Sequence, residues 1–174
     1  FTRMPEMPNR TMILPCFVYI IHLLPMKEIK KELVLLNDIQ EISRLASFIE
    51  VIGEELSLPA TVAFNLNLAL EEAVSNIILY AYPDQTGKEI KVHATTTANC
   101  LVFTLTDTGE AFDPLDVKDT DITLPLEDRP VGGLGIFLIK NIMDEVEYQR
   151  IEGKNIFTLK KELLPTTEKN NVNQ

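Results

Sequence analysis

The sequence predicts an α+β fold, a two-layer α/β sandwich in which helices cover one face of a mostly antiparallel sheet. Segments with apolar residues at every second position alternate with segments of helical spacing. Their order is strand, helix, helix, strand, strand, loop, helix, strand, strand. Short turns join the strands of the two adjacent pairs, as in antiparallel hairpins. A length of 174 residues fits one domain with extensions.

The first two elements are a strand and a helix. The β-rich stretch 29–36 precedes Asn37 and Asp38, a pair of residues that cap helices well. Residues 39–56 then repeat apolar side chains at helical spacing. We therefore expect a strand that leads through a capped start into the first helix.

A second helix and a strand pair follow. Pro59 opens this helix, where a missing N–H costs nothing, and the helix runs to about Tyr82. Residues 89–96 alternate apolar and polar side chains, and 101–106 form a second strand after a short turn. The helix carries an apolar stripe that should face the core: Leu66, Ala69, Leu70, Ala73, Ile77 and Ala81.

The last part of the domain contains a long loop, a helix and a hairpin. Residues 108–131 show no sustained period, and a loop of this length inside a domain is often functional. A helix is predicted over about 133–143. Strands at 145–151 and 155–162 flank a turn of good hairpin chemistry.

Composition excludes several classes of function. The chain carries a formal net charge of −10 and has no basic run, so a nucleic acid is a poor partner. Cys16 and Cys100 offer no disulfide framework, which favours a reducing compartment and a cytoplasmic protein. His22 and His93 leave little room for a zinc centre.

The two ends of the chain differ from its centre. Residues 1–25 hold four prolines and one apolar run that is too short to span a bilayer, so no membrane span is expected there. Three interpretations of this leader stay open: a poorly ordered segment, a partner-binding or membrane-touching arm, and a signal peptide. The signal peptide fits least well, because no small-residue cleavage site follows the apolar run. We expect the domain at 26–164 and a disordered polar tail at 165–174.

Three motifs carry chemistry, and the first lies in the second long helix. Glu72 and Asn76 in the run EEAVSN are four residues apart, so they lie on one helix face. A glutamate can accept a proton, and an asparagine can offer Mg²⁺ a neutral oxygen. The alternative is an ordinary solvated face, because glutamate is a good helix former.

The second motif ends a strand. Asp107 follows an apolar run and precedes Thr108 and Gly109. A carboxylate there can accept a hydrogen bond from an exocyclic amino group such as that of adenine, and Gly109 permits a ring to approach closely. The alternative is a strand-ending turn, for which Asp-Thr-Gly is suitable.

The third motif is a glycine cluster before the third helix. Gly132, Gly133 and Gly135 flank Leu134 and fall within four residues. Free N–H groups at a helix start form an anion site, for which phosphate is the natural occupant. A flexible hinge is the alternative, and the cluster lacks the lysine of a P-loop.

Together the motifs carry a family resemblance. EEAVSN, DTGEAFDP and GGLGIFLI resemble the N, G1 and G2 boxes of the GHKL (Bergerat-fold) ATP-binding superfamily. The resemblance covers about 29–163 and is strongest to the anti-sigma-factor serine/threonine kinases of bacterial partner-switching systems. It implies that the loop at 108–131 is an ATP lid.

The resemblance also implies roles for individual residues. Glu72 would be the general base, Asn76 the Mg²⁺ ligand and Asp107 the acceptor of the adenine amino group, with Gly109 lining the base. The residues at the phosphates would be Gly132, Gly133, Leu134 and Gly135, and Arg129 would be the lid arginine near the γ-phosphate. Ala111 departs from the family pattern, because many members carry a second glycine there.

The implied function is an ATP- and Mg²⁺-dependent serine/threonine protein kinase. Its substrate would be a small STAS-type anti-sigma-factor antagonist, and a sigma factor would be the competing partner that it sequesters. Kinases of this group are often homodimers. The alternative is a nucleotide-binding module that sequesters a partner without phosphoryl transfer.

Overall fold

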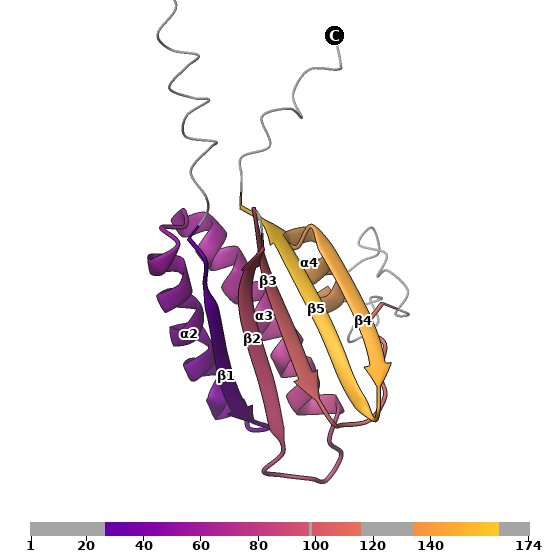
Figure 1. The fold of residues 1–174 in the computed structure, drawn as a ribbon. Coiled ribbons are helices and arrows are strands. Elements are labelled where there is room, and N and C mark those ends of the chain that lie inside the picture. The colour runs from indigo at the N-terminus through magenta and orange to yellow at the C-terminus, as the bar shows by residue number, and fades with distance from the viewer. Residues whose placement is uncertain (1–26, 98, 116–133, 164–174) are drawn as a thin grey trace, which may run out of the picture.

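The computed structural model describes residues 27–97, 99–115 and 134–163. A five-stranded sheet lies on one side and the helices on the other (Figure 1). The sheet order is β1-β2-β3-β5-β4, and every pairing in it is antiparallel. The strands are β1 (Lys30–Leu36), β2 (Glu89–Thr97), β3 (Cys100–Asp107), β4 (Glu145–Ile151) and β5 (Lys154–Glu162). The predicted two-layer α+β fold is confirmed.

Three α-helices cover one face of the sheet: α2 (Ile42–Glu55), α3 (Ala60–Tyr80) and α4 (Leu134–Ile142). In Figure 1, α2 lies behind β1, α3 behind the middle strands and α4 behind β5 and β4. The element order matches the one predicted from the sequence. The leader 1–25, the tail 165–174 and most of the predicted lid lie outside the described residues. The division into a domain at 26–164 with two extensions therefore stays a prediction.

Asn37 and Asp38, the predicted capping pair before the first helix, have different roles in the structure. The Asp38 carboxylate accepts a hydrogen bond from the Gln40 N–H at 2.9 Å, which caps a short 3₁₀ turn (Ile39–Glu41) ahead of α2. Asn37 instead accepts from the Lys88 N–H at 2.9 Å and donates to the Gln85 carbonyl at 2.7 Å. It therefore ties the end of β1 to the loop that precedes β2.

The core forms between α3 and the inner face of the sheet. Ile90, Val92 and Ala94 are buried, as the strand alternation predicts. The predicted apolar stripe of α3 is buried at every position except Ile77, which is half-buried. Helix α3 is long and apolar enough to cross a membrane, judged by length and composition alone. Its buried residues pack in the same core as the strands, which accounts for this apolar character.

Ion pairs hold the end of α2 against β1. Glu55 on α2 accepts from Lys31 at 2.7 Å and from Lys27 at 3.1 Å. The hydrogen bond from Lys31, followed by that from Lys27, lowers the pKa of the Glu55 carboxyl. A lowered pKa in the folded state means that this contribution to stability is present near neutral pH and is lost as the pH falls.

Candidate active site

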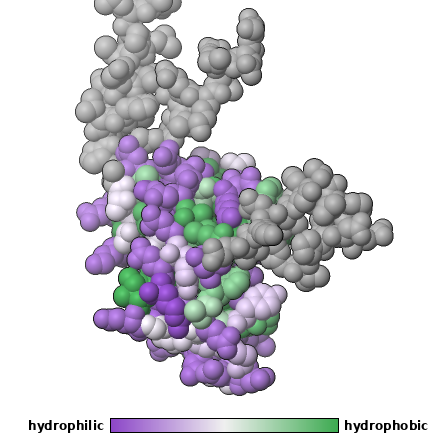
Figure 2. Space-filling view, turned by 90° about the vertical axis from the view of Figure 1, so that its right-hand side faces the viewer, coloured by the Kyte–Doolittle hydropathy of each residue, from purple (hydrophilic) through white to green (hydrophobic). Residues whose placement is uncertain are grey.

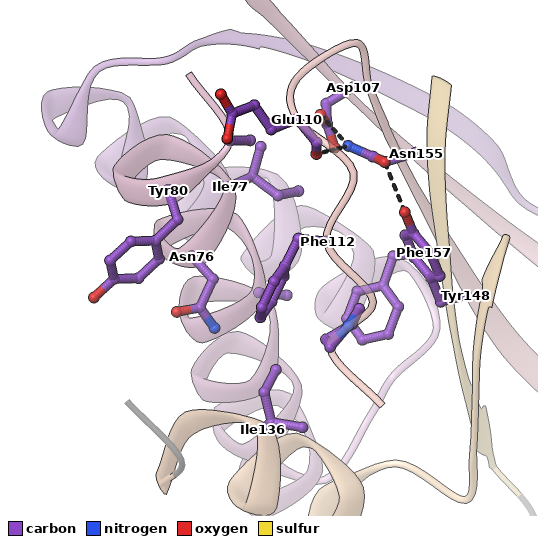
Figure 3. A pocket seen from close by; sticks show the side chains of 13 residues that line it. Asn76, Ile77, Tyr80, Asp107, Glu110, Phe112, Ile136, Tyr148, Asn155 and Phe157 are labelled. Atoms are coloured by element: carbon purple, nitrogen blue, oxygen red, sulfur yellow. Dashed lines mark hydrogen bonds between the residues drawn. The ribbon is translucent and has the colours of Figure 1, made fainter. Parts of the chain in front are cut away.

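An open cavity lies between the C-terminal half of α3 and the ends of β3 and β5. Figure 3 shows side chains from α3, from the segment after β3 and from the β4–β5 hairpin that converge on it. Its walls are largely apolar and aromatic: Ile77, Tyr80, Phe112, Ile136, Tyr148 and Phe157. This lining, with a few polar groups among apolar and aromatic side chains, is typical of a site for a small organic ligand. An aromatic lining suits a flat ring in particular.

Asp107 lies at one end of this cavity. It is the last residue of β3, and only 4% of its surface is exposed. Its Oδ1 accepts hydrogen bonds from the Gly109 N–H and from Nδ2 of Asn155, both at 2.8 Å. The structure thus holds the predicted acceptor in a fixed position in the wall of this cavity.

Glu72 and Asn76 meet the start of α4. A methyl group built on Gly135 would lie 2.5 Å from Oε2 of Glu72 and 3.7 Å from Nδ2 of Asn76. Glycine therefore leaves space between these two side chains and the first turn of α4. Asn76 also lines the cavity that ends at Asp107. The structure brings four sequence-predicted residues of three separate motifs into one continuous region.

The other predicted site residues divide into two groups. Leu134 is the first residue of α4 and is 55% exposed. Arg129, Gly132 and Gly133 lie outside the described residues. Among the residues that the structure describes, no group of three or more His, Cys, Asp or Glu side chains could enclose a metal ion. Mg²⁺ typically takes one or two protein ligands and its remaining ligands from phosphates and water, so the role expected of Asn76 needs no such group and stays a prediction.

Gly109 has a packing role that the sequence does not reveal. A methyl group at this position would lie 2.4 Å from the carbonyl oxygen of Ala81 and 2.6 Å from the Ala81 methyl group. The next residue, Glu110, donates its N–H to the same carbonyl at 2.8 Å. The absence of a side chain thus lets the segment after β3 contact the end of α3. That Gly109 also lines a bound base stays a prediction.

We expect Gly109→Ala to destabilise the fold. The atoms in the way are the backbone carbonyl and the methyl group of Ala81, neither of which can rotate aside, so the segment after β3 must move away from α3 at a cost of about 1–3 kcal/mol. A thermal melt should show a Tm lower by about 2–10 °C. Gly53→Ala is the control, because a methyl group there meets the Ala63 side chain at an acceptable 3.4 Å and sits within a helix. Equal melting temperatures for Gly109→Ala and the wild type would contradict the packing role.

Sequence reasoning missed the polar cluster behind Asp107. Asn155 is 6% exposed and donates both to Asp107 and to the Glu110 carbonyl, the latter at 2.9 Å. Tyr148 and Arg150 on β4 both donate to its Oδ1. The sequence does contain a signal for Asn155: it occupies an inward position of β5, where Phe157 and Leu159 are buried. A polar residue at an apolar position of a strand indicates a buried hydrogen-bonding role.

Comparisons with known proteins agree with this geometry. A family model described as a histidine kinase-like ATPase domain matches residues 35–161. The serine-protein kinase RsbW of Bacillus thuringiensis (strain Al Hakam) is 32% identical over 100 residues, which cover 55% of this chain and 62% of that protein. RsbW of Bacillus anthracis is 31% identical with the same coverage. The chain thus spans 62% of the length of the curated relatives that it matches.

Solved structures share the fold. The RsbU and RsbW domains of Rv1364c from Mycobacterium tuberculosis superpose with a TM-score of 0.56 at 15% identity, over 78% of this chain and 32% of that one. The blue-light activated histidine kinase EL346 of Erythrobacter litoralis gives a TM-score of 0.50 at 16% identity, over 82% and 43% of the two chains. The family resemblance predicted from EEAVSN, DTGEAFDP and GGLGIFLI is confirmed. The chain belongs to the histidine kinase-like ATPase domain family.

Proposed function

We propose that this chain is an ATP- and Mg²⁺-dependent serine/threonine protein kinase of the anti-sigma-factor type. The observation that carries the proposal is the meeting of Glu72 and Asn76 with Gly135 at the start of α4, beside the cavity that ends at Asp107. Membership in an ATPase domain family supports ATP as the ligand. The similarity to proteins named serine-protein kinase RsbW supports transfer to a protein hydroxyl.

The cavity supplies the groups that a purine nucleotide needs. The aromatic and aliphatic walls would enclose the base, and the buried Asp107 would accept a hydrogen bond from its amino group. The first turn of α4 would present backbone N–H groups to the phosphates, with Gly135 leaving space for them. Asn76 would provide an oxygen for Mg²⁺, whose charge would offset that of the phosphates and of the developing transition state.

Glu72 would act as the base. Its Oε2 lies at the start of α4, which would be the phosphate end of the proposed site. There it would take the proton from a serine or threonine hydroxyl as the hydroxyl oxygen bonds to the γ-phosphorus, and ADP would leave with the electron pair of the broken bond. A glutamate base suits a hydroxyl acceptor. The chain's own residues therefore position the reactants and accept one proton.

The partners follow from the resemblance to partner-switching kinases. We place the acceptor hydroxyl on a small STAS-type antagonist protein, and a sigma factor is the second partner, bound when the antagonist is phosphorylated. Arg129 and the glycines at 132 and 133 would complete the phosphate end of the site. Both partners act in the bacterial cytoplasm, which we propose as the location of this chain, and a homodimer is the proposed assembly.

We expect nucleotide binding to depend strongly on Mg²⁺. The stretch 107–130 carries eight acidic and two basic side chains, and this net charge of −6 would repel a triphosphate. ATP at 100 times its Kd should stabilise the full chain by about 2.7 kcal/mol. That corresponds to a Tm higher by about 5–10 °C, measured in a thermal melt with Mg²⁺. With EDTA most of the shift should disappear. Equal shifts in Mg²⁺ and in EDTA would contradict this expectation, and the absence of any shift would contradict ATP binding itself.

A further inference from the structure

Three side chains on the β4–β5 hairpin form a closed polar cluster with the end of β3. We call Asn155, Tyr148 and Arg150 the hairpin clasp. The sheet register explains how they meet, because Asn155 pairs with Asp107 on one side and with Arg150 on the other. Side chains of residues paired across neighbouring strands lie on the same face of a sheet. Figure 3 shows Asn155 between Asp107 and Tyr148.

Every polar atom of the Asn155 side chain has its full set of partners. Nδ2 donates to Oδ1 of Asp107 at 2.8 Å and to the Glu110 carbonyl at 2.9 Å. Oδ1 accepts from the Tyr148 hydroxyl at 2.8 Å and from Nη1 of Arg150. An amide has two N–H donors and two acceptor lone pairs, so none is left for a ligand. Asn155 therefore lines the cavity without a free group for a bound molecule.

The clasp permits only one orientation of this amide. Arg150 can only donate, and Asp107 and the Glu110 carbonyl accept in the observed arrangement. A rotated amide would set its oxygen against two acceptors and its N–H groups against the Arg150 donor. Tyr148 and Arg150 thus decide that Asn155 presents a donor to Asp107.

The same contacts hold one wall of the cavity. Nη1 of Arg150 also donates to the Gly109 carbonyl at 3.1 Å, and Asn155 holds the Glu110 carbonyl. The segment then continues to Phe112 and Pro114, which line the cavity. The hairpin is therefore bonded to the acceptor Asp107 and to the segment that carries an aromatic wall.

We infer that Asn155, oriented by Tyr148 and Arg150, is a positioning residue that fixes Asp107 for recognition of the nucleotide base. It acts through Asp107 and makes no polar contact with the base. This inference rests on the proposed ATP site and adds to it a determinant of base affinity on a hairpin that none of the three sequence motifs includes. Its consequence is that the affinity for ATP follows the protonation state of whatever group faces Oδ1 of Asp107.

The decisive variant is Asn155→Asp in the full chain. It places a carboxylate oxygen where Nδ2 now lies, 2.8 Å from Oδ1 of Asp107. Two carboxylates this close repel each other while both are charged, and Arg150 attracts only the one at position 155. Asp107 then has no donor on this side, and we expect ATP to bind about tenfold more weakly than to the wild type. A proton shared between the two carboxylates restores the donor, so binding should recover as the pH falls.

The measurement is the ratio of variant to wild-type Kd for Mg²⁺-ATP between about pH 5.5 and 8.5. The ratio removes the titration of ATP itself. Asn99→Asp is the matched control, because it makes the same change at an exposed position beside the opposite end of β3. It should give a ratio near one at every pH. A ratio for Asn155→Asp that stays near one at every pH would overturn the inference, because ATP would then bind beside Asp107 without any donor from residue 155.

Two further readouts separate this inference from the proposed function. Without nucleotide, the Tm of Asn155→Asp should fall increasingly below that of the wild type as the pH rises, because the two carboxylates repel each other when both are charged. A wild-type Tm at every pH would overturn the clasp even if ATP never binds. The double variant Tyr148→Phe with Arg150→Gln keeps the aromatic wall and frees the amide to rotate. It should weaken ATP binding about threefold or more, and an unchanged Kd would also overturn the inference.

Discussion

Glu72→Gln should abolish most phosphoryl transfer and leave nucleotide binding nearly intact. The rate of transfer to a protein acceptor is expected to fall by about 10²–10⁴, the usual contribution of a general base. Glutamine keeps the size and the hydrogen-bonding oxygen of glutamate but cannot accept a proton at neutral pH. The side chain lies against the start of α4, away from Asp107, so the base end of the cavity is unaffected.

The measurement pairs a phosphorylation assay with an ATP titration. Glu71→Gln is the matched control: it makes the same change one residue earlier, where Oε1 of Glu71 accepts from Nδ2 of Asn67 at 2.8 Å on a different face of α3. This control should phosphorylate at the wild-type rate. Transfer by Glu72→Gln at that same rate would show that Glu72 is not the base. A wild-type protein that binds ATP and captures a partner without transfer would instead be the sequestering module, the alternative that the sequence leaves open.

Asp107→Asn should remove most of the affinity for ATP. Two donors, the Gly109 N–H and Nδ2 of Asn155, already face Oδ1 at 2.8 Å, so the amide oxygen of an asparagine would take that position. Its N–H₂ group would then replace the second carboxylate oxygen. A donor would meet the amino group of the base, and neither could be satisfied. We expect a loss of about 2–3 kcal/mol, which is roughly thirty- to a hundredfold in Kd.

Isothermal titration of Mg²⁺-ATP checks this expectation, with the apo melting temperature as a measure of folding. Asp113→Asn is the control within the same segment. Oδ1 of Asp113 accepts from the Leu115 N–H at 2.8 Å, and an asparagine oxygen can accept the same bond. That variant should bind ATP with wild-type affinity. Full retention of binding by Asp107→Asn would mean that the base does not meet this carboxylate.

Much of the fold was predictable because its signals are local. Alternation in β2 predicts that Ile90, Val92 and Ala94 face inward, and helical spacing predicts the buried stripe of α3. The sequence could not tell which residue of the capping pair caps the helix, and the reason is physical. Asn37 and Asp38 are equally good caps by residue type, and only the neighbouring loop decides that Asn37 bonds to residues 85 and 88.

The sequence by itself determined the motifs and their order. Spacing of four residues places Glu72 and Asn76 on one helix face, and the glycine cluster precedes a helix that begins at Leu134. The resemblance to the GHKL superfamily then predicts that Glu72, Asn76 and the glycine cluster belong to one site. The close approach of Gly135 to both side chains is a property of how α3 packs on α4, which no local pattern encodes.

Only the tertiary structure decided the surroundings of Asp107. The sheet order places β5 between β3 and β4, so Asn155 lies beside a residue 48 positions earlier in the chain. The register of both pairings then aligns Asp107, Asn155 and Arg150 in one row. Hydrogen bonds across strands depend on register, and register depends on burial of the whole inner face. A single asparagine in β5 therefore acquires its role only when the sheet is complete.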